Sequence, residues 1–325
     1  MDRSKRSFFG IFFETGLYRV CILLLMCVVM SFISANFFKI GNLINIARQA
    51  SVLLILASCA TGCILTHGID NSLGGVMSLC GCACGYFLNH NYSIVASILL
   101  AVVIGAAFGC INGFLIAIVK IPPFVSTYGV SYIANGLALI LMGSDIFCSF
   151  PKAFRNLSTG NLGAFPLLVI WALLVTALMY VALQRSNFGK KVYSVGANYT
   201  TAKYSGISTV STLFVVYILS ACGAALAGVL QAARQSAAQA GMGDTFQMLA
   251  IASIVMGGTS MAGGEGNVLG GILGALILTL IVNAMNLLGV PSLAQSLITG
   301  AVIILAVLMD VQMKRIQYSR PQEKA

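Results

Sequence analysis

Long apolar runs follow one another along almost the whole chain, and short polar intervals separate them. A helix needs about 20 apolar residues to cross the hydrocarbon core of a bilayer. Measured against that length, the runs predict about ten membrane spans, and a count of eight or nine stays open because several runs are short. The predicted spans cover residues 17–34, 47–66, 72–88, 94–119, 124–142, 165–184, 211–232, 245–258, 267–287 and 293–310.

The composition agrees with a membrane protein. The 325 residues are 59% hydrophobic and 8% charged, whereas soluble domains carry about 25% charged residues. The sequence therefore predicts an all-α polytopic protein with a single transmembrane domain at 17–311 and cytoplasmic tails at 1–16 and 312–325. The first run could also be a signal peptide, but it lacks a small-residue cleavage site, which favours a first span.

The positive charge predicts the orientation. The net charge is +10, and the cations gather in short intervals between spans, as the positive-inside rule describes. An even number of spans returns both termini to the cytoplasm, and this distribution argues against a nucleic-acid partner. The intervals predicted to face the cytoplasm contain Lys120, Arg185, Lys190, Lys191 and Lys203.

The ten cysteines lie in or beside apolar runs, where cysteine acts as a small hydrophobic residue. The cluster "CGCACG" at 80–85 lacks the spacing and the second ligand pair of a zinc site. We therefore expect no metal.

Two glycine-rich segments interrupt the apolar pattern. In "GIDNSLGGVM", Asp70 and Ser72 stand before Gly74, where they could cap the next helix. The segment is either a capped loop or a broken helix at a cytoplasmic gate.

The second glycine-rich segment is "IVMGGTSMAGGEGNVLGG" at 254–271. Its glycines disfavour a continuous helix, and Thr259 and Ser260 could cap the helix after it. We expect a tight re-entrant turn or gate that includes Gly263 and Gly264. The chain has no GxxxxGK[ST] motif, so nothing predicts nucleotide binding here.

The acidic residues bear on the energy source. Asp70, Asp244, Glu265 and others all fall at the ends of predicted spans. Ion-driven carriers usually need ionisable groups near the bilayer centre. The sequence therefore argues against an ion-coupled secondary transporter, which stays the alternative, and against a membrane enzyme.

The interval Tyr193–Ser208 reads "YSVGANYTTAKYSGIS". Asn198 can cap a short helix, and Gly206 can take the left-handed position after it. So short a helix is marginal alone, and its expected exposed face carries Tyr199, Lys203 and Tyr204. It is either a simple cytoplasmic connector or a docking element for a soluble partner.

An ordered series of motifs identifies a family. The chain resembles the permease subunits of ribose-type ABC sugar importers over roughly Asn36 to Asp310. The motifs that carry the resemblance are "GIDNSLGGVMSL", "GCINGFLIAIVKIPPFVSTYG", "NFGKKVYSVGANYTTAKYSGI", "LSACGAALAGVLQAAR", "AIASIVMGGTSMAGGEGNVLGGILGALI" and "NLLGVPSLAQSLITGAVIILAVLMD".

The resemblance implies a multi-pass permease of the bacterial inner membrane. It implies a second permease subunit, identical or not, a cytoplasmic ABC ATPase that binds ATP and Mg, and an extracytoplasmic solute-binding protein that delivers a monosaccharide. No cofactor is expected on this chain itself, and the lipid bilayer surrounds it.

The resemblance also implies that the loop at about 185–210 contacts the ATPase. The chain departs from the family pattern at Thr201, at Lys203, at Asn71 and at Glu265. The residues of this loop that are expected to couple to the ATPase are Gly196, Asn198, Ala202, Lys203, Ser205, Gly206 and Ile207.

Overall fold

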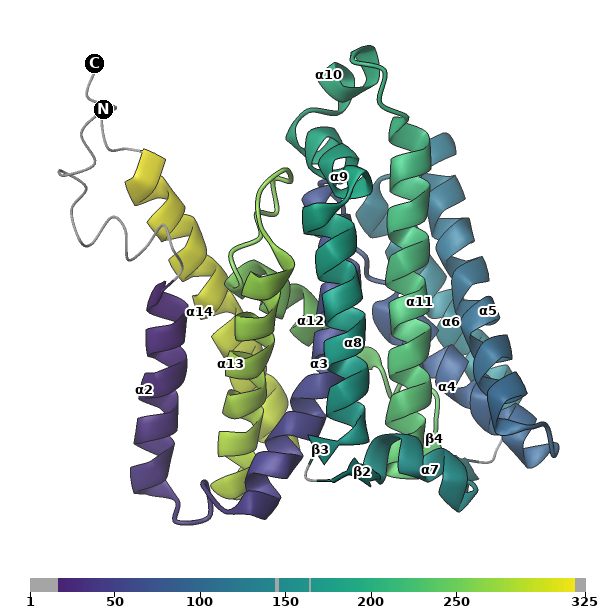
Figure 1. The fold of residues 1–325 in the computed structure, drawn as a ribbon, viewed down its shortest axis with the longest axis vertical. Coiled ribbons are helices and arrows are strands. Elements are labelled where there is room, and N and C mark those ends of the chain that lie inside the picture. The colour runs from purple at the N-terminus through teal and green to yellow at the C-terminus, as the bar shows by residue number, and fades with distance from the viewer. Residues whose placement is uncertain (1–16, 144–145, 164, 319–325) are drawn as a thin grey trace.

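Apolar helices lie at all ten predicted positions (Figure 1). The computed structural model of the protein describes residues 17–143, 146–163 and 165–318. The apolar helices are α2 (Leu17–Ile33), α3 (Ile40–Leu65), α4 (Leu73–Asn89), α5 (Ile94–Gly113), α6 (Pro123–Met142), α8 (Leu167–Tyr180), α11 (Thr209–Gln235), α12 (Asp244–Met256), α13 (Val268–Leu287) and α14 (Ser292–Tyr318). Wider π-helical turns extend α5 and α8 as η2 (Phe114–Ile118) and η3 (Val181–Arg185).

In the described part of the chain, six helices are long and apolar enough to cross a membrane, which makes this a multi-pass membrane protein. They are Ile40–Leu65, Ile94–Ile118, Pro123–Met142, Leu167–Arg185, Thr209–Gln235 and Val268–Leu287. The other four apolar segments, Tyr18–Ile33, Leu73–Asn89, Asp244–Met256 and Leu293–Leu305, are shorter. The predicted count of about ten spans is therefore not established. The predicted tail at 312–325 overlaps the end of α14, and residues 1–16 and 319–325 lie outside the described residues.

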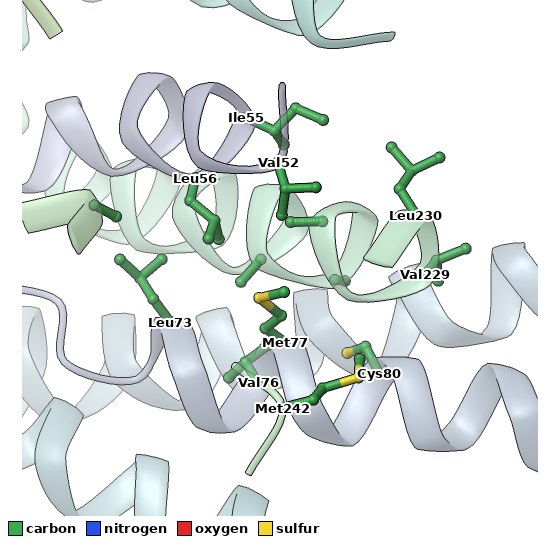
Figure 2. Packing of buried hydrophobic residues seen from close by; sticks show 14 of the residues in the cluster. Val52, Ile55, Leu56, Leu73, Val76, Met77, Cys80, Val229, Leu230 and Met242 are labelled. Atoms are coloured by element: carbon green, nitrogen blue, oxygen red, sulfur yellow. The ribbon is translucent and has the colours of Figure 1, made fainter. Parts of the chain in front are cut away.

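The core is centred on α11, which packs against α3, α4 and α5. Small residues allow this close approach, as is usual between membrane helices. At Gly228, an added methyl group would overlap the carbonyl oxygen of Met77 on α4. Figure 2 shows Met77, Cys80 and Met242 filling the space beside this crossing.

The described cysteines are free thiols, and those on α3 and α4 are buried in this core. Within the described ranges, no group of three or more His, Cys, Asp or Glu side chains could hold a metal ion.

Short elements cap the two ends of the bundle (Figure 1). At one end lie α9 (Asn187–Ala197) and α10 (Tyr199–Tyr204). At the other end lie α7 (Lys152–Thr159) and the strand pair β2 (Asn161–Leu162) and β3 (Phe165–Pro166). A second small pair joins β1 (Phe147–Cys148) to β4 (Ala237–Ala238).

The helices α4 and α12 are short because both begin inside the bundle. The backbone N–H of Gly243, just before α12, donates to Ser78 Oγ of α4 at 3.0 Å. Gly243 also lies so close to Gly74 that a methyl group on Gly243 would overlap the Gly74 carbonyl oxygen. The N-terminal ends of the two short helices therefore meet within the protein.

Candidate functional site

The α9–α10 segment (residues 187–207) has the local structure that the sequence predicts. Asn198 Oδ1 accepts the backbone N–H of Thr201 at 2.9 Å, which caps α10. Gly206 has a φ of +81°, the left-handed conformation that favours glycine. The N–H of Ile207 then donates to the carbonyl of Ala202 at 3.1 Å and closes the helix. The predicted Asn198 cap at the beginning of α10 and the predicted left-handed Gly206 after its end are both confirmed.

One side of α10 is anchored and the other is free. Ala202 is buried against Ala117, Val195 and Leu213, and Ile207 is half-buried beside them. Lys203, Ser205 and Gly206 are exposed, and Tyr204 is 90% exposed. The anchored side fixes α10 to the bundle, so that the free side forms a defined surface.

The expected exposure of Tyr199 is wrong. Its side chain is half-buried, and the Lys120 ammonium donates to its hydroxyl at 2.7 Å and lies 4.8 Å from its ring centroid. That hydrogen bond from Lys120 holds the pKa of the Tyr199 phenol below its usual value. The contact joins α10 to the turn between η2 and α6. It places Lys120 and Lys203, two of the cations predicted to face the cytoplasm, at the same end of the bundle.

A three-way junction fixes α9. The N–H of Gly264 donates to the carbonyl of Leu65, the last residue of α3, at 2.9 Å. Gly196 packs against both groups, since a methyl group there would overlap the Leu65 oxygen. Tyr193 Oη donates to the carbonyl of Gly266 at 2.7 Å, and burial raises the pKa of this phenol. The sequence treats these segments separately, and the structure brings them together.

The α12–α13 turn (residues 257–267) is irregular because of its glycines. Gly258, Gly263, Gly264 and Gly266 all have positive φ angles, which explains why no helix continues through it. Its placement as a re-entrant element stays a prediction.

The expected caps in this turn are wrong. The hydroxyl of Thr259 is buried without a hydrogen-bond partner, and Ser260 Oγ accepts the N–H of Ala262 at 3.3 Å. The cap of α13 is Asn267, whose Oδ1 accepts the N–H of Gly270 at 2.5 Å.

Asp70 forms the centre of a buried polar cluster. It is 2% exposed, and its two carboxylate oxygens accept from Ser72 Oγ at 2.5 Å and from Ser220 Oγ at 2.6 Å. Asn112 Nδ2 donates to Ser72 Oγ at 2.9 Å. Ser72 therefore does not cap α4 with its side chain, contrary to expectation, because its hydroxyl is engaged with Asp70 and Asn112.

Asp70 and Asp244 lie at the beginnings of the short helices α4 and α12, as expected, but these beginnings lie beside the middle of longer helices. Ser220, the partner of Asp70, is near the middle of the 27-residue helix α11. Asp244 Oδ1 accepts from Asn135 Nδ2 at 3.1 Å, and Asn135 lies in the central third of α6. A carboxylate at the centre of a span costs about 2.5–3.5 kcal/mol by insertion scales. These two acids therefore need protein or water around them.

The sequence did not single out Lys120, Tyr193 or Leu65 as anchors of the α9–α10 segment. Lys120 could have been found as a cation next to a proline turn, and Tyr193 as an aromatic within the same motif. Leu65 contributes only its carbonyl oxygen, so no side-chain signal could have revealed it. The assembled site is a short, partly exposed helix tied to the ends of three other elements.

The bundle of long apolar helices is that of a multi-pass membrane protein. The sequence profile of the family described as "Branched-chain amino acid transport system / permease component" matches residues 42–307. The ribose import permease protein RbsC of Escherichia coli K12 is 34% identical over 293 residues, covering 89% of this chain and 91% of that protein. The galactose/methyl galactoside import permease protein MglC of the same organism is 33% identical, covering 94% and 96%.

A third relative, the D-allose transport system permease protein AlsC of Escherichia coli K12, is 33% identical over 84% of each chain. Among solved structures, a metal-chelate type ABC transporter in an inward-facing conformation covers 93% of this chain at 15% identity, with a TM-score of 0.47, which is too low to show a common fold. The chain belongs to this permease family, and the resemblance to ribose-type sugar permeases is confirmed.

Proposed function

We propose that the chain is the membrane-spanning permease subunit of an ABC importer for a monosaccharide or a similar small polar solute. Solute reaches it from an extracytoplasmic binding protein, and ATP hydrolysis on a partner ATPase drives the transport cycle. The observation that carries this proposal is the membership of a family whose relatives are named as ribose, galactose and allose permeases.

The structure supports the mechanical part of this proposal. The free side of α10 presents Lys203 and Tyr204 at one end of the bundle, where a soluble partner can reach them. A push on α10 passes into α9, and through the Gly196 junction into the end of α3 and the α12–α13 turn. We infer that this end faces the cytoplasm of a bacterium, in its inner membrane, and that a second permease subunit completes the solute path. ATP and Mg then belong to the ATPase.

The alternative is an ion-coupled secondary transporter. The absence of acids from span centres no longer argues against it, because Asp70 and Asp244 lie beside helix centres. Family membership now carries the preference for ABC-driven import.

The charge of Lys203 tests the proposal. The full chain is co-expressed with its proposed ATPase and binding-protein partners, and uptake of radiolabelled D-ribose, D-galactose and D-allose is measured. Lys203→Glu reverses a charge on the free side of α10, so both uptake and co-purification of the ATPase should fall at least about tenfold. The matched control is Lys39→Glu, an exposed cation outside the α9–α10 segment, which should leave both unchanged.

Uptake that continues after ATP depletion and collapses with an ionophore would overturn the proposal in favour of the ion-coupled carrier. Unchanged ATPase binding by the Lys203→Glu chain would remove α10 from the coupling role.

A further inference from the structure

One stripe of α6 has a composition that contact with lipid does not explain. Phe124, Tyr128 and Tyr132 are exposed and lie one turn apart on the same side of the helix. The hydroxyls of the two tyrosines lie 3.0 Å apart and bond to each other. Tyrosine is usually enriched at the membrane interfaces, but Tyr132 is the tenth residue of the 20-residue helix.

A carboxylate extends this stripe. Asn135 follows Tyr128 by seven residues, on the same side of α6, and its amide donates to Asp244 at 3.1 Å. Asp244 is exposed at the first turn of α12, whose beginning meets the beginning of α4 inside the bundle. Acids within spans face the protein interior or a water-filled space. Because Asp244 and the two phenols are exposed and not buried in the bundle, a water-filled space fits this stripe better than acyl chains do.

The charges of the stripe indicate which solutes it accepts. Neither α6 nor α12 contains a lysine or an arginine, so Asp244 is the one charged side chain of these two helices. A carboxylate or phosphate on a solute is repelled there. Hydroxyl groups of an uncharged sugar can bond to the phenols, the amide and the carboxylate, and its C–H faces can lie on the aromatic rings.

We propose that this stripe (Phe124, Tyr128, Tyr132, Asn135 and Asp244) lines the water-filled solute path and selects uncharged polyhydroxylated solutes over anions and amino acids. The proposed selection among solutes rests on the proposed transport function. The access of water to the stripe and the negative charge beside it do not rest on that function. Both can be measured without transport.

The experiment introduces thiols into the full-length chain in bacterial membranes, in a background with Cys21→Ser and Cys148→Ser, since both cysteines are exposed. Tyr132→Cys places a thiol on the stripe. The matched control is Val103→Cys, because Val103 is the tenth residue of the 20-residue helix α5 and is 63% exposed, against 65% for Tyr132. The probes are the cationic and anionic methanethiosulfonate reagents MTSET and MTSES.

The thiol at 132 should react with MTSET at least about tenfold faster than the thiol at 103. Its MTSET-to-MTSES rate ratio should exceed that of a free thiol by about tenfold, because the carboxylate attracts one reagent and repels the other. Asp244→Asn should bring the ratio back toward the free-thiol value. Tyr128→Cys provides a second position on the stripe if Tyr132→Cys does not insert.

Three outcomes would overturn the inference. The thiols at 132 and 103 could both react slowly, which would mean a lipid-facing stripe. The thiol at 132 could form a disulfide between two chains while excluding both reagents, which would mean a dry interface with a second copy. The MTSET-to-MTSES rate ratio at position 132 could also stay unchanged in the Asp244→Asn variant, which would mean that this carboxylate does not face the stripe. The proposed function is tested separately by uptake. If uptake does not depend on the ATPase, the proposed function fails, but the thiol-labelling rates at position 132 are unaffected.

Discussion

The junction at Gly196 is the most sensitive contact of the α9–α10 segment. Its α-carbon lies against the carbonyl oxygen of Leu65 and the N–H of Gly264, and these two groups bond to each other at 2.9 Å. The substitution Gly196→Ala adds one methyl group at this point. We expect it to separate α9 from the end of α3 and from the α12–α13 turn.

The size of the effect follows from the geometry. The added methyl carbon would overlap the Leu65 oxygen and lie 2.7 Å from the Gly264 nitrogen. Overpacking of this kind costs about 1–3 kcal/mol, and loss of the hydrogen bond adds about 1 kcal/mol. The sum of about 2–4 kcal/mol shifts the balance between docked and undocked α9 by roughly 30- to 900-fold.

Limited proteolysis of the purified chain measures this shift. Trypsin cuts after Lys190 and Lys191 only when α9 opens locally, so the cleavage rate follows the population of the open form. Gly196→Ala should raise that rate at least tenfold. Gly41→Ala is the control, because an added methyl group at that position meets nothing within 4 Å. If Gly196→Ala and wild type are cleaved at equal rates, the junction does not hold α9.

Three further substitutions test the same contacts. Asn198→Ala removes the cap on the Thr201 N–H, so α10 should lose about 1 kcal/mol, seen as faster amide exchange in α10 and not in α7. Asp70→Ala leaves its hydroxyl donors, among them Ser220, without an acceptor, which should cost about 2–5 kcal/mol of stability. The half-aggregation temperature of the purified protein should therefore fall clearly more for Asp70→Ala than for Asp70→Asn. Because the pKa of the Tyr199 phenol is lowered in the folded protein, the contact with Lys120 gains stability as pH rises through that folded pKa and is weaker below it. The absorbance change of Tyr199 should therefore have its midpoint at a lower pH than that of a free tyrosine, and the Lys120→Met substitution should move that midpoint to a higher pH.

Hydropathy placed the apolar helices well because each apolar run is bounded by polar residues or glycine. The Asn198 cap and the Gly206 turn were also predictable, since both depend on local backbone chemistry. The depth of Asp70 and Asp244 was not predictable, because hydropathy does not show that α4 and α12 begin inside the bundle. Thr259 and Ser260 were equally plausible caps by residue type, and only the turn geometry selects Asn267.

The helix α11 has 27 residues and is about 40 Å long. Near one end Leu213 packs with Ala202 of α10, and near the other end the Leu230 carbonyl accepts from Ser158 of α7 at 2.6 Å. A rigid helix held in this way would carry a small tilt imposed at one end of the bundle to the opposite end as a displacement. One stiff helix thus joins the α10 end of the bundle to the α7 end, with no chain of separate segments between them.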